Sequence, residues 1–274
     1  MRIKNVALAA VFTLTTAFAS HASIIEPGFN GSTLAPNDDG STGAVNIGFD
    51  VNFFGLTFSQ LFVNNNGNVT FDSTLSSFTP FDLTSTGRQI IAPFFADVDT
   101  RNAGDTVTYG MGSFAGMMAF GVNWLNVDYF SSNTEHTNRN SFQLILVDRS
   151  DVATGDFDII FNYDQIQWET GTASGGDANG LGGNSARVGY SNGTGDSGSF
   201  FELAGSAVNG ALLDGGSNSL VSNRLNSDFD GRYIFNARSG TIVVPPTSVP
   251  EAHAFAIFGL GLMLIMAVRR RQNR

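Results

Sequence analysis

Two carboxylates stand out among the residues that could do chemistry. Asp97 and Asp99 lie two positions apart, just after the apolar run Ile90–Phe95. Alternate side chains of an extended strand share a face, so this spacing predicts that both carboxylates point the same way. Together with loop carbonyls they form a candidate calcium site, because calcium prefers oxygen ligands. The alternative is a strand-end cluster in which Arg101 or turn amides satisfy both carboxylates.

Other carboxylates offer weaker patterns. The stretch Asn37-Asp38-Asp39-Gly40 has a similar density of oxygen atoms, but its composition is also that of an ordinary turn. The residues after Asp99 do not fit an EF-hand, which requires Gly at position six and Glu at position twelve. A glycosidase pair drawn from Asp97, Asp99, Asp128 and Glu169 depends on their separation in space, which the sequence does not give.

Candidate nucleophiles lack partners in the sequence. Ser191 lies in a Gly-x-Ser-x-Gly pattern, which as a nucleophile elbow needs a following helix and a downstream histidine. The residues after this pattern are rich in glycine, and the only downstream histidine is His253 near the C-terminus. The Gly195-Asp196-Ser197-Gly198 stretch fails for a similar reason, and His136 lies in a polar segment typical of an exposed loop. The chain has no cysteine, and its one lysine is Lys4, so we predict no catalytic residue.

The positions 23–248 are strongly acidic. They hold eight arginines against 23 acidic residues, which gives a net charge of −15, compared with −10 for the whole chain. Such a surface repels nucleic acid and anionic lipid, and it favours cation binding. Nucleic acid is therefore excluded as a partner, and an anionic polysaccharide would need an arginine patch or a bridging cation.

The elements that must position these residues are predicted to be short strands. Apolar and polar residues alternate with a period of two, separated by Gly- and Asn-rich turns. Asn66-Gly67 is typical of a type I′ hairpin turn. Phe142–Val147 and Phe157–Tyr163 form a predicted hairpin, Leu125, Val127 and Tyr129 form one face of a half-buried strand, and Gly171–Asn184 is a long surface loop. The 25 phenylalanines against 5 tyrosines indicate core packing rather than an aromatic sugar platform. The fold class is an all-β antiparallel sandwich with long Gly/Asn-rich loops.

The N-terminus has the three zones of a secretory signal. Arg2 and Lys4 precede an apolar stretch, and small residues follow it at Ser20 and Ala22. We expect a signal helix at residues 1–22 with cleavage after Ala22, or after Ala19 as the alternative. The domain after this signal, at 23–240, is then exported.

The C-terminus combines a short motif, an apolar run and a basic end. Val249, Pro250 and Glu251 precede 17 apolar residues at 252–268, which as a helix span about 26 Å and only just cross a bilayer. The stop-transfer residues Arg269, Arg270 and Arg271 then remain in the cytoplasm. This arrangement at 249–274, after a linker at 241–248, resembles the PEP-CTERM sorting signal of Gram-negative bacteria, although Ala252 stands where that signal usually has a second proline. The resemblance implies a transient inner-membrane stage and cleavage by an exosortase, and a simple membrane anchor is the alternative.

Five blocks between Phe49 and Ala237 resemble the NIDO domain, the extracellular domain first described in nidogen and alpha-tectorin. In order along the chain they are Phe62–Phe71, Ile91–Arg101, Ser141–Leu146, Phe161–Trp168 and Ala186–Tyr190. The resemblance implies a role in extracellular matrix or adhesion without an established catalytic activity. It does not carry over any basement-membrane partner, because the modules that accompany the domain in animals are absent from this sequence.

These features together predict a non-enzymatic exported protein of the cell surface or extracellular matrix. Its expected partners are an exosortase and the inner membrane, transiently, and then an exopolysaccharide or another matrix component of a biofilm. A calcium-dependent exopolysaccharide-binding module is the alternative function, and a glycoside-cleaving enzyme is a third. The candidate calcium ion is the one cofactor that the sequence suggests.

Overall fold

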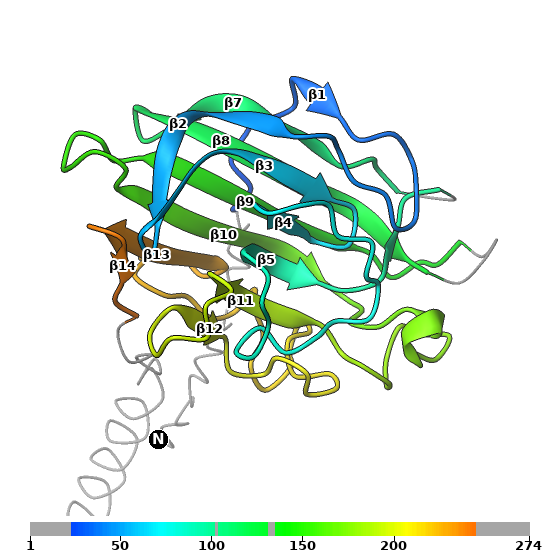
Figure 1. The fold of residues 1–274 in the computed structure, drawn as a ribbon. Coiled ribbons are helices and arrows are strands. Elements are labelled where there is room, and N and C mark those ends of the chain that lie inside the picture. The colour runs from blue at the N-terminus through cyan, green and yellow to red at the C-terminus, as the bar shows by residue number, and fades with distance from the viewer. Residues whose placement is uncertain (1–22, 102–103, 131–134, 245–274) are drawn as a thin grey trace, which may run out of the picture.

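Two antiparallel β-sheets packed face to face make up the fold (Figure 1). The computed structural model describes residues 23–101, 104–130 and 135–244. The eight-stranded sheet has the order β1-β7-β8-β9-β10-β13-β14, with β6 also paired to β8, and the six-stranded sheet has the order β12-β11-β5-β4-β3-β2. This arrangement confirms the predicted antiparallel β-sandwich.

The larger sheet consists of β1 (Ser32–Thr33), β6 (Val98–Asp99), β7 (Thr108–Phe114), β8 (Met117–Tyr129), β9 (Asn140–Asp148), β10 (Phe157–Ile166), β13 (Arg232–Arg238) and β14 (Thr241–Ile242). The smaller sheet consists of β2 (Val45–Phe53), β3 (Leu56–Asn64), β4 (Asn68–Thr70), β5 (Ile90–Phe95), β11 (Arg187–Ser191) and β12 (Phe200–Glu202). In the described residues the single helical element is the 3-10 turn η1 (Thr172–Ser174), inside the predicted loop Gly171–Asn184.

No helix in the described part of the chain is long and apolar enough to cross a membrane. The predicted signal helix at 1–22, with its cleavage site after Ala22, lies outside the described residues. The predicted sorting signal at 249–274 also lies outside them. Strand β14 pairs with β13, so the β-structure continues through Ile242, and the domain boundary predicted at 240 falls inside this hairpin.

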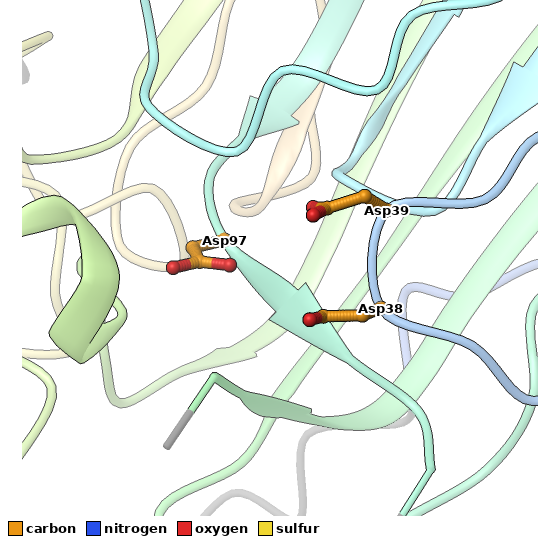
Figure 2. A group of neighbouring side chains, drawn as sticks. All are labelled: Asp38, Asp39 and Asp97. Carbon is orange, nitrogen blue, oxygen red and sulfur yellow. The ribbon is translucent and has the colours of Figure 1, made fainter. Parts of the chain in front are cut away.

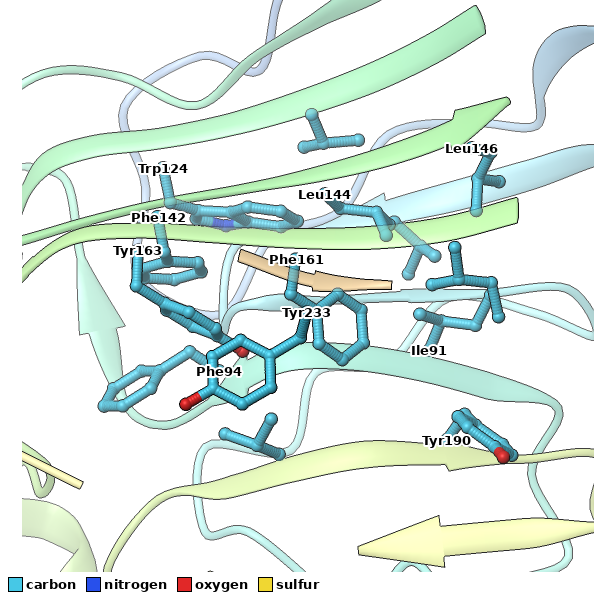
Figure 3. Close-up of a cluster of buried hydrophobic side chains, with 14 of the residues drawn as sticks. Ile91, Phe94, Trp124, Phe142, Leu144, Leu146, Phe161, Tyr163, Tyr190 and Tyr233 are labelled. Carbon is cyan, nitrogen blue, oxygen red and sulfur yellow. The ribbon is translucent and has the colours of Figure 1, made fainter. Parts of the chain in front are cut away.

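Aromatic side chains from both sheets fill the space between the layers (Figure 3). Phe161 and Tyr163 of β10 point into this core, on the face that the alternation along Phe157–Tyr163 predicts. Trp124 of β8 stacks on Phe142 of β9, with ring centroids 5.2 Å apart. The Tyr163 hydroxyl donates a hydrogen bond to the Pro93 carbonyl at 2.6 Å and so ties the two sheets together. The abundance of phenylalanine therefore reflects core packing, as predicted.

Strand β5 is buried on both faces, as its continuous apolar sequence predicts. Ile91 and Phe94 join the main core, whereas Ile90 and Phe95 pack on the other side with Leu83 and its neighbours. Because no residue of β5 is exposed, the chain that leaves it at Asp97 begins in the interior of the protein.

Strand β8 departs from the predicted alternation. The register of β8 with β9 shifts between Trp124 and Val127, and Asn126 adopts a positive φ of 51°. This bulge moves the inward face by one position, so Trp124 and Val127 are both in the core while Leu125 is not. The prediction that Leu125 shares the inward face was wrong, because an extra residue in a strand shifts its period and leaves little trace in the sequence.

The turn between β3 and β4 also differs from the prediction. Asn64 pairs with Asn68, which leaves three residues in the loop, and of these only Gly67 has a positive φ, at 71°. A type I′ turn needs two such residues, so the predicted turn type was wrong although the hairpin was right. Glycine is required because a Cβ at Gly67 would lie 1.8 Å from the Phe94 carbonyl oxygen.

Candidate functional site

Three carboxylates converge at the corner where β5 ends. Asp38 and Asp39 come from the loop before β2, and Asp97 comes from the two-residue connection between β5 and β6 (Figure 2). Each of the three offers an oxygen atom, and these atoms all lie within 4.8 Å of one another. In Figure 2 the side chains of Asp38 and Asp39 point toward Asp97. The fold thus brings together two regions that are about 60 residues apart in the sequence.

Asp97 is the buried member of the cluster. Only 1% of the residue is exposed, and neither carboxylate oxygen receives a hydrogen bond from any residue that the structure describes. Burial raises the pKa of Asp97 to about 8, with the charges of Asp38, Asp39 and Asp99 adding to the rise and Arg101 opposing it. A carboxylate that is buried without a donor costs folding free energy, so this position calls for a ligand or a proton.

Asp38 has one satisfied oxygen and one that is not. Its Oδ2 lies 3.0 Å from Nη2 of Arg101, whereas its Oδ1 is buried and has no hydrogen-bond partner among the described residues. Burial raises the pKa of Asp38 to about 6, and the negative charges of Asp39 and Asp99 contribute smaller increases. Asp39 is half-buried, and its Oδ1 accepts a hydrogen bond of 2.8 Å from the amide of Asn66.

The asparagine turn between β3 and β4 holds both parts of the cluster in place. The Asn65 amide nitrogen donates to the carbonyls of Asp38 at 2.5 Å and of Val98 at 2.6 Å. Asn66 accepts a hydrogen bond of 3.0 Å from the Val98 amide through its Oδ1. Both asparagines are at most 1% exposed. The turn is therefore a buried polar scaffold that fixes the 38–39 loop against the β5–β6 connection.

Gly171 closes the far side of the cluster. A Cβ built on this glycine would lie 2.3 Å from Oδ2 of Asp97, although its φ of −79° is one that any residue can adopt. The absence of a side chain at Gly171 therefore provides space for the Asp97 carboxylate itself. Asn37 fixes the loop that carries Asp38 and Asp39, because its Oδ1 accepts a hydrogen bond of 2.6 Å from the Gly40 amide.

Asp99, the other half of the predicted pair, is engaged elsewhere. Its two oxygens accept hydrogen bonds from Nε of Arg101 at 2.9 Å and from Nη2 at 2.7 Å. The Arg101 backbone amide adds a third, at 2.9 Å. Asp99 is therefore bound by Arg101 and a turn amide, as in the alternative in which the carboxylates form a strand-end cluster. Asp97 instead faces Asp38 and Asp39. The stretch Asn37–Gly40 has the oxygen density of a cation site as well as the composition of a turn, but its sequence does not indicate that Asp38 and Asp39 lie beside Asp97.

The remaining carboxylate candidates serve structural contacts. Asp128 is 1% exposed and contacts Nδ1 of His136 at 2.8 Å and Nη1 of Arg139 at 2.9 Å. Glu169 is fully buried, and its oxygens accept hydrogen bonds from the amides of Gly210 at 2.7 Å and Leu212 at 2.8 Å. Burial raises the pKa of Glu169, and those two amides oppose the rise. Neither carboxylate is free to act on a sugar.

The serine and histidine candidates are not assembled for nucleophilic chemistry. Ser191 ends strand β11, is 1% exposed, and its hydroxyl accepts a hydrogen bond of 3.2 Å from the Gly193 amide. His136 contacts Asp128 through Nδ1 and stacks on Tyr129, with centroids 3.8 Å apart. The histidine predicted in an exposed loop is therefore packed against β8, because the side chain of Asp128 binds it there.

Comparison with known proteins gives a consistent assignment. The family model of the Nidogen-like domain, NIDO, matches residues 59–239. Human alpha-tectorin is 36% identical over 221 residues, covering 72% of this chain and 10% of that protein. Chicken alpha-tectorin is 33% identical over 225 residues, covering 73% of this chain and 10% of that protein. Nidogen from Drosophila melanogaster is 29% identical over 155 residues, covering 47% of this chain and 11% of that protein.

The chain thus spans about a tenth of the length of these relatives. No solved structure matches it. The family match extends from β3 to the turn after β13 and includes Asp97, although Asp38 and Asp39 precede it. Since the family model covers more than half of the sequence, the chain belongs to the nidogen-like (NIDO) domain family.

Proposed function

We propose that the protein is an exported, non-enzymatic adhesion module that binds a component of an extracellular or biofilm matrix. The observation that carries the proposal is the shared domain, which relates 72% of this chain to alpha-tectorin. The family resemblance associates this domain with extracellular matrix and adhesion. The non-enzymatic part of the proposal is supported by the same relatives, which are named alpha-tectorin and nidogen.

Export and processing complete the proposal. The signal at 1–22 directs the chain out of the cytoplasm, and the tail at 249–274 holds the precursor at the inner membrane until an exosortase cuts near Val249, Pro250 and Glu251. The arginines at 269–271 stop translocation, because each charge costs about 2.5–3.5 kcal/mol at the centre of a membrane helix. The mature protein is then displayed at the cell surface or released to the matrix.

A second candidate function is calcium-dependent binding of an exopolysaccharide, and the acidic cluster at Asp38, Asp39 and Asp97 favours it. An acidic domain with a net charge of −15 at 23–248 repels an anionic polysaccharide unless a cation bridges them. Retention on the matrix polysaccharide of the producing organism, measured with calcium and with a chelator, separates the two functions. Binding that is unchanged by the chelator supports matrix adhesion that does not require calcium. Binding that is lost in the chelator supports calcium-dependent binding of the exopolysaccharide.

Deletion of the gene in the native host tests the adhesion role. We expect weaker cell aggregation and biofilm formation, with recovery when the wild-type gene is restored. Unchanged aggregation would contradict the proposal, and release of soluble sugar from the polysaccharide by the purified protein would indicate an enzyme instead. Mass spectrometry of the secreted protein tests the processing step, and an intact Arg274 on the mature protein would indicate an ordinary membrane anchor.

A further inference from the structure

The geometry points to a calcium site formed by Asp38, Asp39 and Asp97, which would fasten the loop before β2 to the corner between β5 and β6. This inference does not depend on the proposed adhesion role. Its starting point is Asp97, a carboxylate that is 1% exposed, has no hydrogen-bond partner among the described residues, and faces two further carboxylates (Figure 2). A buried carboxylate of this kind is stabilised either by a proton or by a cation, and Asp38 and Asp39 beside it add the further oxygen ligands that a cation needs.

The local charge balance argues for a divalent ion. Asp38, Asp39 and Asp97 face one another at this corner, the charge of Asp99 also acts on Asp97, and Arg101 partly offsets these negative charges. The Arg101 side chain gives two hydrogen bonds to Asp99 and one ion pair to Asp38, and it makes no hydrogen bond to Asp97. When all four carboxylates are ionised, four negative charges against the one positive charge of Arg101 leave a deficit of three, and a calcium ion would remove two of these.

The oxygen atoms have a spacing that suits calcium. Ligands on opposite sides of one calcium ion are about 4.6–5.2 Å apart, because each Ca–O distance is about 2.3–2.6 Å. Oxygen atoms that all lie within 4.8 Å of one another therefore fit a single coordination shell. The ligand set contains only carboxylates, which selects a hard cation over zinc or copper. Calcium is favoured over magnesium because it accepts irregular geometry and binds several carboxylates directly, whereas magnesium retains its water.

The protein holds these ligands in place before any ion arrives. Asn65 and Asn66 form hydrogen bonds to the backbone on both sides of the cluster. The amide nitrogen of Asn66 also donates a hydrogen bond to Oδ1 of Asp39. Within the described part of the chain, Oδ1 of Asp38 and both carboxylate oxygens of Asp97 are buried and have no hydrogen-bond partner. An ion at this point would therefore add ligand bonds without breaking any hydrogen bond that the structure shows.

Calorimetric titration of the purified full-length protein with calcium chloride tests the site. We expect one ion per chain, no comparable heat from magnesium chloride, and a melting temperature that rises by roughly 5–10 °C at a hundredfold excess of calcium over its dissociation constant. Asp97→Asn should lower the calcium affinity at least tenfold and abolish most of the thermal shift. Asp39→Asn should also weaken calcium binding, and its amide oxygen can still accept the hydrogen bond from Asn66 at this half-buried position.

The control variant is Asp196→Asn, which removes the same charge from an exposed loop and should leave calcium binding unchanged. The site is refuted if the wild-type protein gives neither heat nor a thermal shift with calcium. It is equally refuted if Asp97→Asn and Asp39→Asn bind calcium as the wild type does, and preference for magnesium would overturn the assignment of the ion. None of these measurements requires a matrix partner, so their failure would leave the adhesion proposal intact.

Discussion

Replacement of Asn65 by aspartate should reveal how strongly the asparagine turn, formed by Asn65 and Asn66, holds the acidic corner at Asp38, Asp39 and Asp97. The two side chains have nearly the same shape, but aspartate has no N–H group to donate. In the structure, the Asn65 amide nitrogen lies 2.5 Å from the Asp38 carbonyl and 2.6 Å from the Val98 carbonyl. The residue is fully buried, so water does not replace the lost donor. Asn65→Asp would also add a negative charge next to three carboxylates.

The expected cost comes from the two carbonyls left without a donor. Each buried acceptor that loses its partner costs about 1–3 kcal/mol, so the free energy of unfolding should fall by about 3 kcal/mol or more. For a domain of this size, that loss lowers the melting temperature by roughly 6–12 °C. Urea unfolding of the purified protein with a chelator present measures the change, because the chelator removes any contribution from calcium.

Asn46→Asp is the matched control for this experiment. Asn46 is exposed, and its Oδ1 accepts a hydrogen bond of 2.8 Å from the Gly48 amide, so a carboxylate can keep that bond. The control changes the charge equally and should alter stability by no more than about 0.5 kcal/mol. If both variants lose the same small amount, then Asn65 is not a donor to the acidic corner and the asparagine turn is not its scaffold.

Three further substitutions test other parts of the structure. Gly171→Ala should destabilise the protein by about 1–3 kcal/mol and weaken calcium binding, because the new methyl group would meet the Asp97 carboxylate; thermal unfolding with and without calcium measures both effects. Glu169→Ala should lower the free energy of unfolding in urea by about 2–4 kcal/mol, since it leaves the buried Leu212 amide and the partly buried Gly210 amide without an acceptor. Trp124→Phe should lower the free energy of unfolding by about 1–2 kcal/mol, because it removes the 3.0 Å hydrogen bond from the indole to the Asn65 carbonyl. For each of the three variants, a stability equal to that of the wild type would contradict the prediction.

The fold was largely predictable because its signals are local. The alternation along Phe157–Tyr163 and the apolar run at Ile90–Phe95 reflect which faces of a strand are buried, and burial acts on each residue separately. The bulge at Asn126 was not predictable in this way. It depends on the pairing of β8 with β9, and an inserted residue changes the inward face without changing the composition of the strand.

The candidate site was predictable only in part, for a related reason. Asp97 was identified because it follows a buried strand, which places a charged group in an interior position. Its partners Asp38 and Asp39 come from a loop about 60 residues earlier, and nothing in their local sequence distinguishes them from a turn. Asp99 was paired with Asp97 on strand spacing alone, but Arg101 is close enough to bind it after the strand ends.

The acidic corner bears on how the loop before β2 is held against the rest of the domain. With no cysteine in the chain, disulfides do not secure the loop before β2. The asparagine turn supplies hydrogen bonds to that loop, and Thr100 adds another, from its backbone amide to the Asn37 carbonyl at 3.0 Å. When the carboxylates of Asp38, Asp39, Asp97 and Asp99 are ionised, their mutual repulsion opposes these bonds, and Arg101 offsets only part of it. A calcium ion bound by Asp38, Asp39 and Asp97 would turn this repulsion into a cross-link, because it would join the loop before β2 to the connection between β5 and β6.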